Sequence, residues 1–239
     1  MKKRLMLAVL LALFTYAAAM AQAGAQDAIK RGNQRYSRGE YEAAIKEYRQ
    51  VPQGEGETYA QALYNIGVCY YELRRTEDAI GMYRRAVESK GGRYPKALYA
   101  LGVALEVSGR LAEAKEAYRQ AIETSDGKYT EERFAVAHYR LGLLFGREGS
   151  YEKAAALFSE ALTRSREKFP AAHNNLGVML ALAGRNAEAE REFETALRQA
   201  TDDFQEAAYN LKLCRSRVKE TESTFASLKV SDATFVLTK

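Results

Sequence analysis

Residues 95–123 read PKALYALGVALEVSGRLAEAKEAYRQAIE, and this stretch decides the fold. In its first half Leu98, Leu101 and Leu105 recur at three- and four-residue spacing, which places them on one face of a helix. Gly109 stands where that helix would end, in a left-handed conformation that glycine adopts without strain. After it, alanines and a tyrosine form the apolar stripe of a second helix. The stretch therefore predicts two antiparallel helices joined by a tight turn.

The same pattern recurs five times along the chain of 239 residues. The equivalent glycines of the first helices follow one another at steps of 35, 35, 40 and 35 residues, and they are Gly32, Gly67, Gly102, Gly142 and Gly177. A sixth, half-length copy begins at Ala207. Repeats of this period indicate stacked helix pairs, each of which buries its apolar face only against its neighbours.

These residues resemble the tetratricopeptide repeat (TPR) family, whose unit of about 34 residues carries an L-G…Y…G-x-Y…A…F/Y…A pattern. The likeness covers about Ala25 to Arg217. It implies an all-α fold, a right-handed α-solenoid of helix-turn-helix repeats with a C-terminal capping helix. The solenoid would span 25–220, with repeats near 25–59, 60–94, 95–132, 133–169 and 170–204 and a capping helix at 205–220.

Three features depart from the family pattern. Arg74 replaces the turn glycine of the second copy. Five extra residues around Thr124–Glu132 predict a longer surface loop. His138 and His173 stand at the family's first aromatic position, where tryptophan is usual.

The N-terminus predicts a signal peptide over 1–23. Three cations lie among its first four residues, an apolar run follows over 5–20, and small residues at A-x-A spacing allow cleavage after Ala21 or Ala23. We therefore expect export, to the periplasm of a bacterium, and no membrane insertion after cleavage. An uncleaved membrane anchor is the rival interpretation, although the apolar run is shorter than the roughly 20 residues of a spanning helix.

Charge and composition exclude other classes of protein. Loss of the three N-terminal cations lowers the net charge from +5 to +2, and no contiguous basic stripe predicts nucleic-acid binding. The chain lacks the short motifs of hydrolases, metalloproteases and nucleotide-binding enzymes, so we expect no enzyme and no cofactor. His138 and His173, one repeat apart, are too distant to share a metal. Cys69 and Cys214, four repeats apart, are too distant for a disulfide.

The family geometry implies a concave groove lined by one stripe of each first helix. Tyrosines beside aliphatic residues recur on this stripe and suit an apolar or aromatic peptide segment. Packing between neighbouring repeats is the alternative role of each tyrosine. Related repeats that clamp the carboxylate of chaperone C-termini use lysine and asparagine here, so we do not expect that ligand. The candidate partner-binding residues are Tyr64, Val68, Tyr71, Tyr99, Val103, Tyr139, Leu143, Asn174, Val178 and Tyr209.

The sequence thus predicts a non-enzymatic extracytoplasmic adaptor or scaffold that binds a protein or peptide in this groove. Two alternatives stay open. One is a self-associating structural scaffold, a homo-oligomer that exchanges its tail between subunits, and the other is a small-molecule carrier working with a transport or envelope system. The β-prone tail, 221–239, has three open arrangements: a loose, flexible end, a segment folded back on the last helices, or a strand added to a partner.

Overall fold

The structure is a computed structural model that describes residues 22–125, 131–166, 168–216 and 228–231. Residues 1–21 of the predicted signal peptide, most of the predicted loop and most of the tail lie outside these ranges. Every regular element within them is helical, which confirms the all-α prediction. The helices are residues 22–36, α2 (Tyr41–Tyr48), η1 (Gln53–Glu55), α3 (Gly56–Glu72), α4 (Thr76–Ser89), α5 (Pro95–Val107), α6 (Leu111–Glu123), α7 (Glu131–Arg147), α8 (Tyr151–Arg164), α9 (Pro170–Leu182), α10 (Asn186–Gln199) and α11 (Gln205–Ser216).

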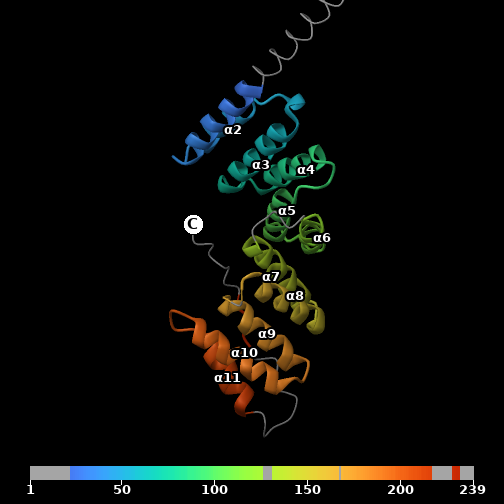
Figure 1. Ribbon diagram of the computed structural model, residues 1–239, viewed down its shortest axis with the longest axis vertical. Helices are drawn as coiled ribbons and strands as arrows, with labels where there is room; N and C mark the ends of the chain where they lie inside the picture. The colour runs from blue at the N-terminus through green and yellow to red at the C-terminus, as the bar shows by residue number, and fades with distance from the viewer. Residues whose placement is uncertain (1–21, 126–130, 167, 217–227, 232–239) are drawn as a thin grey trace, which may run out of the picture. The chain divides into compact units, whose positions relative to one another are not determined.

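The chain forms two compact units, whose boundary in the sequence falls inside α6, between Ala117 and Tyr118. In unit 1, α3 packs against α2, α4 and η1, and α4 packs against α5. In unit 2, α8 packs against α7 and α9, and α10 packs against α9 and α11 (Figure 1). Each unit is therefore a stack in which consecutive helices are neighbours in space, as the repeat pattern predicts.

In four repeats a glycine of the first helix receives an aromatic ring from the second helix, sixteen residues later. A Cβ atom added at these glycines would lie 2.3–2.9 Å from the nearest ring carbon, closer than any real contact. The four aromatic side chains are almost fully buried. The helices of a pair can approach this closely only because the glycine has no side chain. The pairs are Gly32–Tyr48, Gly67–Tyr83, Gly142–Phe158 and Gly177–Phe193.

The turns between paired helices use the left-handed conformation that the sequence predicts. Gly109 has a φ of 78°, and Arg74, which stands at the equivalent position of the second repeat, has a φ of 59°. A residue with a Cβ atom is strained in this region by roughly 1–2 kcal/mol. The second repeat thus keeps the backbone of the turn without the residue best suited to it.

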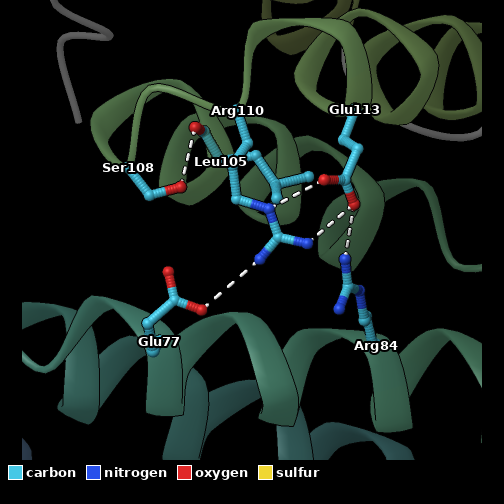
Figure 2. A network of polar contacts seen from close by, with 6 residues as sticks. All are labelled: Glu77, Arg84, Leu105, Ser108, Arg110 and Glu113. Atoms are coloured by element: carbon cyan, nitrogen blue, oxygen red, sulfur yellow. Dashed lines mark hydrogen bonds and ion pairs between the residues drawn. The ribbon is translucent and has the colours of Figure 1, made fainter.

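Ion pairs tie neighbouring repeats of unit 1 together on their surface. Arg110 donates to both carboxylate oxygens of Glu113, at 2.7 and 2.8 Å, and reaches Glu77 of α4 at 3.4 Å (Figure 2). Arg84 of α4 donates to the same Glu113 carboxylate at 2.7 Å. The hydrogen bond from Arg110 is the main cause that holds the pKa of Glu113 below its usual range. Because these groups are largely exposed, the network orients the repeats more than it stabilises them.

Candidate functional site

Two asparagines of unit 2 hold the main chain of residues 228–231, the C-terminal segment. Asn210 of α11 accepts from the Lys229 N–H at 2.8 Å and donates to the Lys229 carbonyl oxygen at 2.7 Å. Asn175 of α9 accepts from the Ser231 N–H at 2.7 Å and donates to the Ser231 carbonyl oxygen at 2.7 Å. Each side-chain amide therefore satisfies both polar groups of one residue, and the bonded residues alternate as they do in an extended chain.

Asn174 and Tyr139 complete this polar network. Asn174 donates to the Lys229 carbonyl oxygen at 3.1 Å and to the Asn175 side chain at 3.0 Å, and it accepts from Asn210 at 2.9 Å. The Tyr139 hydroxyl donates to the Ser231 carbonyl oxygen and accepts from Asn175. The network therefore joins α7, α9 and α11, which are the first helices of three successive repeats.

The buried side chains of the network need the hydrogen bonds that the C-terminal segment provides. The side chains of Asn174, Asn175, Asn210 and Tyr139 are all fully buried. A buried amide that lacks hydrogen-bond partners costs roughly 1–3 kcal/mol. Residues 171–181 of α9 are buried around the whole helix, which is typical of a helix covered on every side. The C-terminal segment therefore supplies partners for amides that this unit places in its interior.

The alternate side chains of the segment face an apolar pocket. Leu228 packs against the core of unit 2, whereas Val230 is 40% exposed. The pocket has a volume of about 340 Å³. Its lining consists of Leu143, Gly146, Arg147, Tyr151, Phe158, Val178, Met179, Leu182, Leu228 and Val230. The asparagines thus bind the main chain of the segment, while the pocket lies beside its two aliphatic side chains, Leu228 and Val230.

The structure brings five of the ten predicted residues around the C-terminal segment. Tyr139 and Asn174 bond its main chain, and Leu143 and Val178 line the pocket. The ring of Tyr209 lies 4.7 Å from the Lys229 ammonium nitrogen, measured to the ring centroid. We define these five side chains together with Asn175 and Asn210 as the unit 2 groove.

The other five predicted residues lie in unit 1, on α3 and α5, where all are partly buried. The Tyr64 ring packs against Tyr83 and Tyr94, at centroid distances of 5.8 and 6.0 Å, and the Lys96 ammonium group lies 4.4 Å from its centroid. Tyr64 thus packs mainly within its own repeat and contacts the next repeat through Lys96. Val68, Tyr71, Tyr99 and Val103 continue the same two helices.

Sequence reasoning missed Asn175 and Asn210; a tail folded back on the last helices was one of its three open arrangements, and residues 228–231 take it, but their place in the groove was not predicted. Two signals could have found the asparagines: they stand one repeat of 35 residues apart, and Asn175 follows Asn174 in a helix that is apolar apart from these two residues and His173. Adjacent amides in such a helix need polar partners from outside it.

The histidines and cysteines are packing residues. His138 is 5% exposed, and its Nδ1 lies 2.7 Å from the Phe134 carbonyl oxygen, so Nδ1 carries the proton. Burial lowers the pKa of His138. His173 Nδ1 lies 2.7 Å from a Glu192 carboxylate oxygen. Cys69 and Cys214 are buried free thiols, and burial raises the pKa of the Cys69 thiol to about 12.

Two further findings concern the part of the chain that the structure describes. No group of three or more histidine, cysteine or acidic side chains is arranged to hold a metal ion there. Among the same residues, no helix combines the length and the apolar character needed to cross a bilayer.

Helix pairs that recur mostly every 35 residues, with a glycine–aromatic contact in four of them, define a helical-repeat protein. The chain belongs to the tetratricopeptide repeat family, whose profile matches residues 23–93, 74–129 and 137–208. This confirms the family resemblance that the sequence shows. No protein in the curated set matches the chain by sequence.

Solved structures share the fold. MamA is 23% identical with a TM-score of 0.61, and the alignment covers 74% of this chain and 91% of MamA. YrrB, reported as a TPR protein with an unusual peptide-binding site, is 22% identical with a TM-score of 0.63 and coverage of 84% and 98%. PilF of Pseudomonas aeruginosa is 18% identical with a TM-score of 0.63 and coverage of 84% and 95%.

Proposed function

We propose that the chain is a non-enzymatic adaptor that binds an extended segment of another protein in the unit 2 groove. One observation supports this most strongly: Asn175 and Asn210 each pair with both main-chain groups of one residue in an extended segment. Pairing of this kind gives affinity through the main chain, while pockets for alternate side chains give selectivity. YrrB, a protein of the same fold, is reported to have a peptide-binding site, which also supports a peptide ligand.

Each part of the unit 2 groove has a separate role in this proposal. Asn174, Asn175, Asn210 and Tyr139 bond the main chain of the ligand, Leu143 and Val178 contact its apolar side chains, and the half-exposed ring of Tyr209 contacts it at the rim. In unit 1, the face that carries Tyr64, Val68, Tyr71, Tyr99 and Val103 would contact a further part of the same partner.

The proposed site of action is outside the cytoplasm, and it rests on the sequence of residues 1–23. The described residues that follow are compatible with cleavage there, because Gln22, Ala23 and Gly24 are exposed and Ala25 is buried. Loss of the peptide would therefore leave the buried face of the first helix intact. N-terminal sequencing of the mature protein from a fractionated native cell tests this: Gln22 or Gly24 as first residue is expected, and Met1 would refute cleavage.

Photo-crosslinking in the native cell tests the adaptor function. A photoreactive phenylalanine replaces Tyr209 at the groove rim in one strain and Val107, which is 60% exposed in unit 1, in a control strain. We expect adducts of higher mass from position 209 that are absent from position 107. Combining the probe with Asn175→Ala and Asn210→Ala should abolish these adducts, whereas Asn65→Ala, at the equivalent repeat position of unit 1, should not. Adducts that persist without both groove asparagines would contradict the proposal.

A further inference from the structure

The occupant of the unit 2 groove belongs to the chain itself. Residues 228–231 make the main-chain bonds that the proposed function assigns to a partner. Because Asn210 and Asn175 use both polar groups of their amides on this segment, a second strand cannot make the same bonds while it is present. Binding of a partner in the groove and binding of residues 228–231 therefore exclude each other.

The segment fills the groove incompletely. The pocket of about 340 Å³ lies directly against Leu228 and Val230, and its other walls include Phe158, Met179 and Tyr151. Val230 leaves 40% of its surface exposed. A larger side chain at the position of Val230 would bury more apolar surface against these walls, and aromatic rings bury the largest areas of all side chains.

We propose, building on the function proposed above, that residues 228–231 are a weak internal occupant of the unit 2 groove. The partner that displaces them is an extended segment with an aromatic side chain where Val230 lies. It has no proline at the positions of Lys229 and Ser231, because both residues donate their N–H groups to the asparagines.

A tethered occupant has a calculable effect on binding. A tethered segment competes at an effective concentration, which we take to be on the order of 1 mM. If its own dissociation constant is about 100 µM, the groove is free in about one molecule in ten, and the apparent affinity for an outside peptide falls about tenfold.

The test compares the full chain with two variants in which the segment is altered. Lys229→Pro with Ser231→Pro removes both N–H donors and should release the segment. Lys229→Ala with Ser231→Ala keeps both donors and serves as the matched control. Circular dichroism verifies that the helices are intact in all three proteins, and light scattering gives their mass.

Three fluorescein-labelled peptides serve as probes in anisotropy titrations. The first copies residues 225–234, the second has phenylalanine in place of Val230, and the third has proline in place of Lys229 and Ser231. The double-proline protein should bind the first peptide about tenfold more tightly than the full chain or the alanine control does. The phenylalanine peptide should bind about fivefold more tightly than the first, and the proline peptide should not bind.

Equal affinity of the full chain and the double-proline protein would overturn the inference and leave the proposed function standing. So would a dimer of the full chain that becomes a monomer on the proline substitutions, because the segment would then be exchanged between copies. A phenylalanine peptide that binds no more tightly than the first would overturn the proposed aromatic preference. Failure of every peptide to bind any of the proteins would overturn the proposed function as well.

Discussion

Gly67 in α3 and Gly81 in α4 offer two glycine-to-alanine substitutions that differ only in what the new methyl group meets. At Gly67 the Cβ atom would lie 2.6 Å from Tyr83 Cε1, whereas ordinary contacts begin near 3.4 Å. Tyr83 is 3% exposed, and its ring also packs against Tyr64, so it cannot move away freely. At Gly81 a Cβ atom would meet nothing within 4 Å.

The expected magnitudes follow from these contacts. Alanine in a helix interior is favoured over glycine by about 1 kcal/mol at both positions. Overpacking of a buried contact costs about 1–3 kcal/mol, and only Gly67→Ala incurs this cost. Gly81→Ala should therefore raise the free energy of unfolding by about 1 kcal/mol, and Gly67→Ala should leave the protein about 1–3 kcal/mol less stable than Gly81→Ala.

Urea unfolding followed by far-UV circular dichroism measures both variants beside the parent chain. The difference between the two variants isolates the steric cost, because the gain in helix propensity is common to both. Equal stability of Gly67→Ala and Gly81→Ala would refute the close approach of α3 and α4, and with it the physical reason for a glycine in each first helix.

Two further substitutions test local features of the fold. Arg74→Gly should stabilise unit 1 by about 1 kcal/mol, since the exposed Arg74 occupies a left-handed turn that glycine adopts without strain; unchanged or lower stability in urea unfolding would contradict this. Burial lowers the pKa of His138, so the unfolded chain takes up a proton first as the pH falls. The stability that neutral His138 contributes is thus complete above about pH 6.5 and is lost below it, toward the lowered pKa. His138→Phe should flatten the change in urea midpoint between pH 7.5 and 5.5, and an equally steep change in this variant would show that other groups cause it.

The fold was predictable because its decisive contacts repeat. Gly67 and Gly177 mean little alone, but a glycine at the same place in five copies, followed by an aromatic residue sixteen positions later, indicates a helix pair packed at its closest point. Arg74 was predictable as the turn residue for the same reason, since the residues at the same position of the other repeats are glycines.

The candidate site was predictable only in part, because two of its asparagines lie off the predicted stripe. Tyr139 and Asn174 lie on the predicted stripe, but Asn175 and Asn210 stand one position further on, about 100° around the helix. The six equivalent residues are Lys30, Asn65, Ala100, Arg140, Asn175 and Asn210, so asparagine recurs in three copies, but the recurrence is interrupted and does not by itself mark a site. The C-terminal segment is too short to show a strand pattern, and its partners lie 19 to 92 residues away along the chain.

Hydrogen exchange at the amides of Lys229 and Ser231, measured by NMR on the full chain, tests most directly whether the unit 2 groove binds an extended main chain through its asparagines. Both N–H groups should exchange about tenfold more slowly than in a free peptide of the same sequence, as expected of a segment that leaves the groove in about one molecule in ten. Asn210→Ala should remove the protection of Lys229, Asn175→Ala should remove that of Ser231, and Asn65→Ala should change neither. Exchange of both amides at free-peptide rates in the unaltered chain would contradict the groove assignment and the function built on it.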